Sequence, residues 1–272
     1  MVAAALAAGW RPQTVFLREE GADELGERLG LRAAGAADGA AGVFVVGDRV
    51  AARISTLETP ADVVAVLPLP ERRQLASLLG PATSPKIAAL RRASGAPSAT
   101  SERAGLLVVY VDGVQDPGNV GTLIRAAVAF GASALVTSSG AADPYGPKTV
   151  RAAMGALFSL PVFPDLPLAD VVDQLPATTV YGLAAHGGGT LDAAELGRPA
   201  VLVVGAERAG ISRAAMGHVD RLVTIPLSAA SGGAVESLNA GVAGAIALYE
   251  FSRRSAGASE DPSRRPPAAQ EG

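Results

Sequence analysis

Three loops of this sequence place glycine and one or two polar residues directly after a hydrophobic stretch. They are VDGVQDPGNVGTLIRAA at 111–127, VVGAERAGIS at 203–212 and TIPLSAASGGAVESLNAGVAGAI at 224–246. Glycine lets main-chain N–H and C=O groups approach a ligand closely, so such loops can recognise an adenosine-like molecule without charged side chains. Any one loop could be only a tight turn at a strand end, so the prediction of a binding site rests on all three together.

Two polar residues stand out in the first loop. Asn119 lies at the mouth of a helix that is otherwise apolar, and Arg125 follows six residues later. Asn119 is an ordinary candidate for the helix N-cap. Arg125 has no acidic residue four positions before or after it, so a surface ion pair does not readily account for it.

Other glycine-rich sites do not fit. A phosphate-binding Walker loop needs GxxxxGK[ST], and neither Lys86 nor Lys148 is placed for one. No GxGxxG follows a first strand, which argues against a nucleotide-binding oxidoreductase, and HGGG at 186–189 resembles an esterase loop but no GxSxG accompanies it. With no cysteine and two histidines, the chain indicates no metal or redox chemistry.

The elements that must position the three loops form a regular α/β alternation from residue 105. Continuous apolar strands are expected at 106–113, 133–138, 179–185, 200–207 and 221–227, with helices at 121–130, 149–158 and 236–251. Unbroken apolar strands covered by helices on both faces predict a mostly parallel sheet. Ligands of such sheets bind outside the carboxyl ends of the strands, which is where the three loops lie.

We predict four segments along the chain. Residues 1–70 form a small α/β domain, 71–104 a linker, 105–252 the larger α/β domain and 253–272 a polar, disordered tail. The apolar start of the chain is too short to cross a bilayer and lacks the pattern of a secretory signal, so we expect a cytoplasmic protein with no membrane partner. The net charge is −3, yet the linker carries six basic residues against two acidic ones. Such a run is usually a solvated segment.

The three loops, in this order and spacing, resemble the three sequence motifs of the SpoU (TrmH-type) branch of SPOUT RNA methyltransferases. The segments KTVRAAMGALFSLPV at 148–162 and STLETPADVVAVLPLP at 55–70 are also similar to this family. The resemblance covers about residues 1–250. It implies a C-terminal domain with a mostly parallel sheet and a deep trefoil knot. It also implies a small N-terminal L30e-like domain that binds substrate RNA and that here begins past the family's basic opening segment.

The family transfers a methyl group from S-adenosyl-L-methionine to the 2′-hydroxyl of one ribose in ribosomal or transfer RNA, and ribosomal RNA is the expected substrate here. Its cofactor sits in the knot loops, and its active site is completed across a homodimer interface at the knot. The resemblance implies cofactor contacts, largely through main-chain atoms, at Gly205, Ile225 and Leu238, with Thr137 as a further candidate. It implies polar active-site roles for Asn119, Arg125, Glu207, Ser237 and Asn239.

The chemistry of methyl transfer agrees with this set. An in-line displacement requires the enzyme mainly to hold the ribose oxygen close to the methyl carbon. Arg125 is the best placed group to contact the hydroxyl or a phosphate, and because its pKa lies above ~12 we expect positioning and electrostatic stabilisation, with proton removal left open. Glu207 could orient Arg125 or Asn119, or it could be a first-turn acid of a helix beginning near residue 210.

Some features depart from the family pattern. Arg208 stands where the family usually has glycine, and SLNAGVA at 237–243 replaces the commoner SLNVSVA. Residues 105–252 hold seven basic and twelve acidic residues. This balance and the missing opening segment leave two alternatives open, a transfer RNA ribose methyltransferase and a non-catalytic knotted relative that binds RNA.

Overall fold

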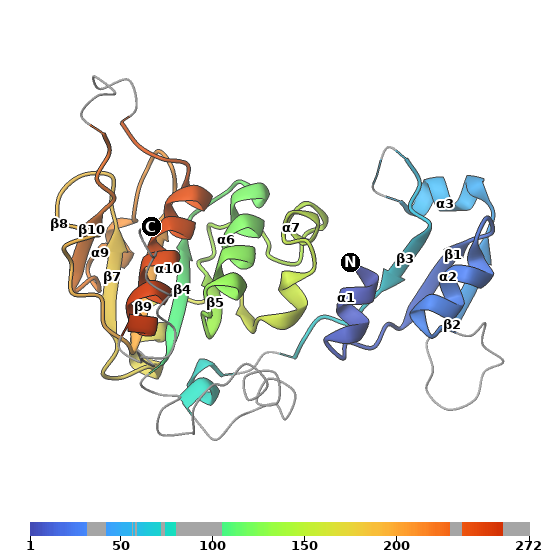
Figure 1. Cartoon of the computed structure of the whole chain (residues 1–272), viewed down its shortest axis with the longest axis horizontal. Helices are drawn as coiled ribbons and strands as arrows, with labels where there is room; N and C mark the ends of the chain where they lie inside the picture. Colours follow the sequence, from blue (N-terminus) through green and yellow to red (C-terminus); the bar gives the residue numbers. More distant parts are fainter. Residues whose placement is uncertain are drawn as a thin grey trace, which may run out of the picture.

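The computed structural model describes residues 1–31, 42–55, 57, 59–71, 74–79, 105–228 and 236–257. These residues form two α/β parts, a small one built from the N-terminal residues and a larger one built from residue 105 onward (Figure 1). The predicted elements that fall on 32–41, 80–104, 229–235 and 258–272 lie outside the described residues.

The small part is a three-stranded sheet with the first strand in the middle. β1 (Thr14–Arg18) pairs in parallel with β2 (Gly42–Val46) and antiparallel with β3 (Val63–Val66). Because side chains alternate along a strand, every second residue of β1 is buried, and α2 (Ala22–Leu29) covers that face. Two further short helices are α1 (Val2–Ala7) and α3 (Asp48–Ile54).

The large part is a seven-stranded sheet in which every neighbouring pair is parallel. Its strand order is β6-β5-β4-β9-β7-β10-β8. The bounds are β4 Leu107–Asp112, β5 Ala134–Thr137, β6 Val162–Phe163, β7 Thr179–Leu183, β8 Gly189–Thr190, β9 Ala200–Gly205 and β10 Arg221–Thr224. The predicted parallel sheet is therefore confirmed, and all five expected strands are present.

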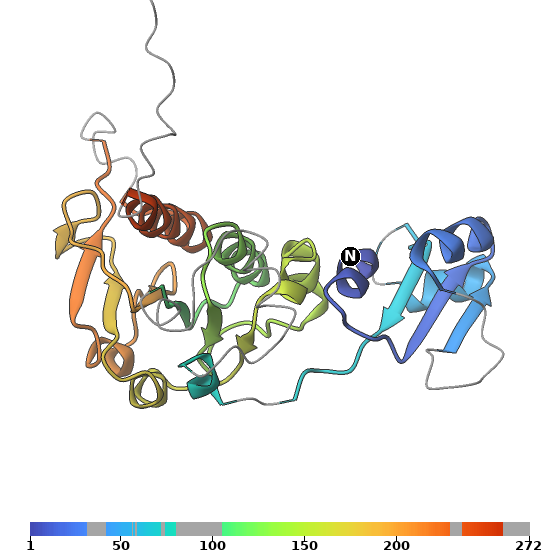
Figure 2. The ribbon, with the colours of Figure 1, turned by 60° about the horizontal axis from the view of Figure 1, so that its bottom comes forward.

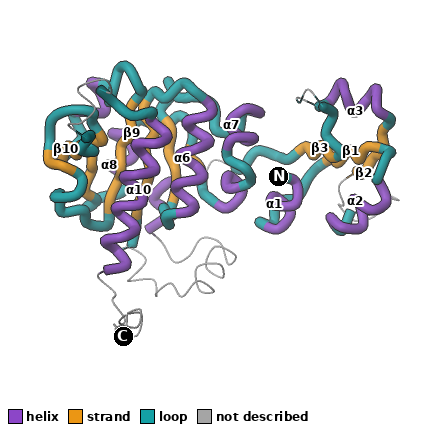
Figure 3. The backbone as a smooth tube through the Cα atoms, turned by 45° about the horizontal axis from the view of Figure 1, so that its top comes forward, coloured by secondary structure: helices purple, strands orange, loops and turns teal. Residues whose placement is uncertain are grey.

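Helices cover both faces of this sheet, which explains the unbroken apolar strands (Figures 2 and 3). On one face α6 (Pro117–Ala129) and α10 (Ala240–Gly257) lie side by side, with α7 (Pro147–Ala152) and the 3-10 helix η2 (Ala156–Ser159) next to α6. On the other lie α8 (Leu168–Gln174), α9 (Arg213–Met216) and the 3-10 helix η1 (Leu75–Leu79). Alternate residues of β4 enter the two resulting cores: Leu107, Val109 and Val111 one, Val108 and Tyr110 the other.

The start of α6 differs from the expectation that Asn119 caps it. Asp116 is the N-cap, and its carboxylate accepts a hydrogen bond from the main-chain nitrogen of Gly118 at 3.0 Å. Pro117 takes the first helical position, where its missing N–H costs nothing. Asn119 therefore lies inside the first turn, and its side-chain amide is free for another partner.

Two contacts connect the segments before residue 105 to helices that cover the large sheet. The indole N–H of Trp10, just after α1, donates to the main-chain oxygen of Phe158 at 3.1 Å, and the two rings meet edge to face. Leu75 of η1 is buried, and its main-chain nitrogen donates to the side chain of Gln174 at 3.0 Å. At the other end, α10 runs to Gly257, so residues 253–257 belong to this helix and not to the tail expected at 253–272. No helix of the described residues is long and apolar enough to cross a membrane.

Candidate functional site

A cavity of about 260 Å³ opens at the carboxyl edge of the large sheet. It lies where β9, β7 and β10 end, as expected for a ligand site of a parallel sheet. Its wall is formed by residues 183–185 at the end of β7, by residues 204–207 and 209–211 at the end of β9, and by Met216 of α9. The chain after β10 contributes Ile225, Leu227, Glu236, Ser237, Leu238, Ala240 and Ala243. The described lining is mostly small or apolar, and the volume is close to the lower end of the range for small-molecule sites.

Glu207 joins the three predicted loops at one atom. Its Oε1 accepts hydrogen bonds from the side-chain amide of Asn119 at 2.7 Å and from that of Asn239 at 2.5 Å. The main-chain nitrogen of Ala240 also approaches the same oxygen at 3.4 Å. Because Asn119 is 6% exposed, its amide needs this acceptor. The carboxylate thus fixes the starts of α6 and α10 against the end of β9.

The loop after β9 is a tight turn that admits no side chain at its base. Ala206 and Gly210 exchange two main-chain hydrogen bonds, at 3.0 and 2.7 Å. A Cβ added to Gly205 would lie 2.3 to 2.5 Å from the main chain of Gly210 and Ile211. The φ angle of Gly210 is +66°, which favours glycine. The loop therefore presents main-chain atoms to the cavity in a fixed arrangement.

A buried carboxylate at the end of β4 binds the end of the same loop. Asp112, at the end of β4, is 5% exposed and accepts a hydrogen bond from the main-chain nitrogen of Ser212 at 2.6 Å. The Ser212 side chain in turn caps α9. Glu207 is consequently not a first-turn acid of that helix, which begins at Arg213.

The structure brings together most of the residues expected at the site. Gly205, Glu207, Ile225, Ser237 and Leu238 line the cavity, and Asn119 and Asn239 bind Glu207. Arg125 lies on an exposed face of α6 and makes no hydrogen bond or ion pair with any described residue. Thr137 is buried at the end of β5, outside the cavity lining, so its cofactor contact stays a prediction.

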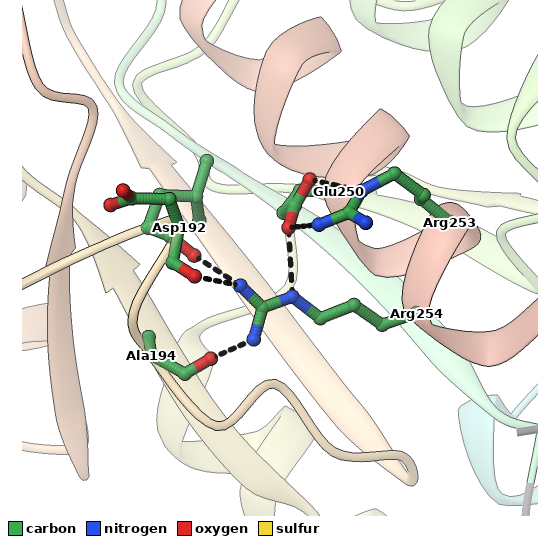
Figure 4. A network of polar contacts seen from close by, with 6 residues as sticks. Asp192, Ala194, Glu250, Arg253 and Arg254 are labelled. Atoms are coloured by element: carbon green, nitrogen blue, oxygen red, sulfur yellow. Dashed lines mark hydrogen bonds and ion pairs between the residues drawn. The ribbon is translucent and has the colours of Figure 1, made fainter. Parts of the chain in front are cut away.

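The sequence did not predict that residues 183–185 line the cavity. Arg254 binds the turn at 191–194, which follows this wall in the chain (Figure 4). The Arg254 guanidinium donates to the main-chain oxygens of Leu191, Asp192 and Ala194. The main-chain nitrogen of Leu191 donates to the main-chain oxygen of Thr224 at 2.8 Å. Thr224 directly precedes Ile225, which lines the cavity. The end of α10 is thereby linked to two cavity walls. No local sequence motif marks this role. Arg254 lies in the stretch predicted as a tail, so the sequence provided no reason to expect it near the cavity.

Glu250 completes this network. Its carboxylate binds Arg254 at 2.8 Å, four residues on, and also Arg253 at 2.5 Å. The hydrogen bonds to Arg253 and Arg254 lower the pKa of Glu250 to about 2. The carboxylate is therefore charged at neutral pH and orients the guanidinium of Arg254 toward the 191–194 turn.

Comparisons with known proteins agree with this arrangement. The family model described as SpoU rRNA Methylase family matches residues 106–249. The 23S rRNA (guanosine(2553)-2′-O)-methyltransferase RlmP of Bacillus subtilis is 33% identical over 210 residues, covering 76% of this chain and 71% of that protein. The 23S rRNA (uridine(2479)-2′-O)-methyltransferase of Streptomyces viridochromogenes is 36% identical over 159 residues, 56% of this chain and 54% of that protein.

A solved structure matches nearly the whole chain. It is the crystal structure of the SpoU methyltransferase AviRb from Streptomyces viridochromogenes in complex with the cofactor AdoMet, with a TM-score of 0.71 and 27% sequence identity. The match covers 94% of this chain and 88% of that one. The similarity thus extends over both α/β parts.

Proposed function

The chain belongs to the SpoU rRNA methylase family and is an S-adenosylmethionine-dependent RNA ribose 2′-O-methyltransferase; we propose that its substrate is 23S ribosomal RNA. The observation that carries the proposal is the meeting of three loops at Glu207 beside a cavity at the carboxyl edge of the sheet. The substrate follows from the relatives, two of which are named as 23S rRNA 2′-O-methyltransferases.

The cavity fits the methyl donor by its chemistry. Gly205, where a Cβ would collide with the opposite strand of its loop, leaves main-chain groups as the recognition surface. Together with Ile225 and Leu238 it would hold the donor, with apolar side chains around the adenosine and main-chain groups satisfying its polar atoms. When bound, S-adenosylmethionine supplies an activated methyl group on a sulfonium. The chain's task is therefore to exclude water and to hold the acceptor oxygen in line.

The polar groups at the cavity mouth suit the acceptor ribose. Glu207 keeps the Asn119 and Asn239 amides in fixed positions, so both are oriented before the acceptor ribose binds. Ser237, next to them, offers a hydroxyl that can donate to or accept from a ribose oxygen. Arg125 has no internal partner among the described residues, which leaves its guanidinium available to the 2′-hydroxyl or to a phosphate.

The active protein is a homodimer in this proposal. Val128 of α6 and Val242, Ile246 and Tyr249 of α10 are large apolar residues that are exposed on two helices packed side by side. Exposed apolar residues gathered on neighbouring elements are typical of an interface between chains. Arg125 lies on an exposed part of α6. A partner seated on α6 and α10 would therefore bring the ribose-binding groups of the two copies close together.

The remaining assignments follow from the family. Ile225, Leu227 and residues 236–238 line the cavity beside the 205–211 loop, and the family resemblance places the expected trefoil knot here. Residues 1–70 act as the domain that binds RNA, and 71–104 join it to the methyltransferase domain, which runs from residue 105 to the end of α10 at Gly257. The enzyme acts in the cytoplasm, where ribosomal RNA is made.

The test is methyl transfer from labelled S-adenosylmethionine to unmodified 23S rRNA and, separately, to transfer RNA. We expect label in 23S rRNA that is recovered as a 2′-O-methylated nucleoside after digestion. Label in transfer RNA alone would favour the transfer RNA alternative. No label in either RNA, with donor binding intact by calorimetry, would favour the non-catalytic relative.

A further inference from the structure

The methyltransferase part is acidic, yet two of its unpaired cations, Arg125 and Arg208, lie on elements that also carry site residues. Residues 105–252 hold seven basic and twelve acidic residues. Arg198 and Arg221 donate to main-chain oxygens, and Arg151 is also engaged. The other four make no hydrogen bond or ion pair within the described parts of the chain: Arg125 on α6, Lys148 on α7, Arg208 in the loop after β9 and Arg213 on α9.

Arg208 is the cation whose place relative to the site is best defined. It directly follows Glu207, so their Cα atoms are about 3.8 Å apart. The loop that carries it is closed by the two hydrogen bonds between Ala206 and Gly210, which fix its main chain. Glu207 and Ala209 both line the cavity, whereas Arg208 between them does not, and it is exposed to solvent. Its side chain therefore lies outside the cavity lining, between two residues that form the wall.

A guanidinium in this position matches the chemistry of an incoming RNA strand. Every ribose in RNA is flanked by phosphates, and the 2′-hydroxyl is next to the 3′-phosphate. Arginine recognises phosphate through a planar fork of N–H donors. An RNA strand approaching the cavity also meets the carboxylates of Glu207 and Glu236, which line the cavity and are exposed. A neighbouring positive charge offsets their repulsion of the phosphates.

We propose that Arg208 binds a phosphodiester group of the RNA beside the ribose that receives the methyl group. This rests on the proposed function, because it names a contact of the same site with its RNA substrate. The contact neutralises one phosphate and sets the register of the strand at the cavity mouth without reading a base.

The carboxylate of the methyl donor is the other anion that Arg208 could meet. The position of Arg208 outside the cavity lining favours the RNA phosphate. The two ligands are distinguished by measuring each one separately with the same variants.

The test compares Arg208→Gln, which removes the charge, and Arg208→Lys, which keeps it, with the matched control Arg221→Gln. Arg221 is also an exposed arginine, but it lies at the start of β10, at the end of the strand opposite the cavity. Binding of an unmodified 23S rRNA transcript is measured by filter binding over a range of salt concentrations, and binding of S-adenosylmethionine by calorimetry. Neither assay depends on methyl transfer.

For Arg208→Gln we expect about tenfold weaker RNA binding at low salt and a salt dependence of log K that is shallower by about 0.7, the value for one phosphate of a single strand. Arg208→Lys should keep the wild-type slope, and Arg221→Gln should match wild type in both assays. Donor affinity should be unchanged in all three variants. An unchanged slope in Arg208→Gln, or the same loss in Arg221→Gln, would overturn the proposal, as would weaker donor binding with RNA binding intact. If wild type binds the transcript but does not methylate it, the proposed function fails while the Arg208 contact is still decided by the slope.

Discussion

Asn119 and Glu207 lie 88 residues apart in the chain, yet the amide of the first donates to the carboxylate of the second at 2.7 Å. This bond connects the helix after the first strand of the large sheet to the tight loop after β9. Asn119 is nearly fully buried, so the bond also satisfies a polar group that has lost contact with water. The same carboxylate oxygen binds Asn239, and the site is therefore organised around Glu207.

Replacing Glu207 by alanine should impair both folding and catalysis. The Asn119 and Asn239 amides lose their acceptor, and the buried Asn119 then costs about 1–3 kcal/mol of unfolding free energy. Misplaced amides should lower kcat for methyl transfer by about 100-fold. Urea unfolding and single-turnover kinetics measure the two effects. In Glu207→Gln the side-chain oxygen can still accept, so its stability should lie closer to wild type; equal kcat for Glu207→Ala and wild type would contradict the role given to Glu207.

Gly205→Ala should act on donor binding. Its Cβ would lie 2.3 to 2.5 Å from the opposite main chain of the loop, so the loop must move or open. We expect a stability loss of about 1–3 kcal/mol and much weaker binding of S-adenosylmethionine by calorimetry. Gly189→Ala is the matched control, because nothing lies within 4 Å of a Cβ built there. Wild-type donor affinity in Gly205→Ala would show that the loop does not contact the donor.

Arg125→Ala should separate catalysis from folding. The side chain is exposed and unpaired among the described residues, so the unfolding free energy should change by no more than about 0.5 kcal/mol. Loss of one preorganised donor near the reacting oxygen should lower kcat by about 100-fold or more, with donor affinity unchanged. Arg221→Ala serves as the control for a lost surface arginine. Retained transfer in Arg125→Ala would remove Arg125 from the site.

Lowering the pH should weaken the contact between Arg254 of α10 and the main-chain oxygens of the 191–194 turn. A carboxyl whose pKa is lower in the folded protein than in the unfolded chain stabilises the fold above its unfolded pKa, and this stabilisation is lost as the pH falls through the folded value. For Glu250 the pKa falls from 4.5 to about 2, so the loss should occur between these two pH values. Urea midpoints across this window should fall more steeply for wild type than for Glu250→Gln. Asp173→Asn, an exposed acid of α8, should behave as wild type; parallel curves for Glu250→Gln and wild type would contradict this contribution.

Much of the fold could be predicted because its signals are local. Unbroken apolar runs such as 106–113 mark strands buried on both faces, and the glycine-rich ends of β4, β9 and β10 mark the edge where a ligand binds. The roles of single side chains depend on distant partners and were harder to predict. Asp116, three residues before Asn119, proved to be the cap, because a cap is decided by main-chain geometry that several polar residues can satisfy.

Contacts across the fold could not be predicted from one sequence. Arg254 binds main-chain carbonyl oxygens some sixty residues earlier in the chain. Because every residue has such a carbonyl, the sequence does not indicate which ones an arginine will bind. The wall at 183–185 likewise becomes part of the cavity only because β7 lies between β9 and β10 in the sheet. Strand order is a property of the whole fold, so a segment's place in it is not encoded locally.

The central claim is tested most directly by mapping ribose methylation in 23S rRNA from cells that carry the gene and from cells that lack it. The account predicts one 2′-O-methylated ribose that is present only when the gene is present and that is restored by the wild-type protein but not by Arg125→Ala. Identical methylation maps in the two strains, together with no transfer to 23S rRNA by the purified protein, would contradict it.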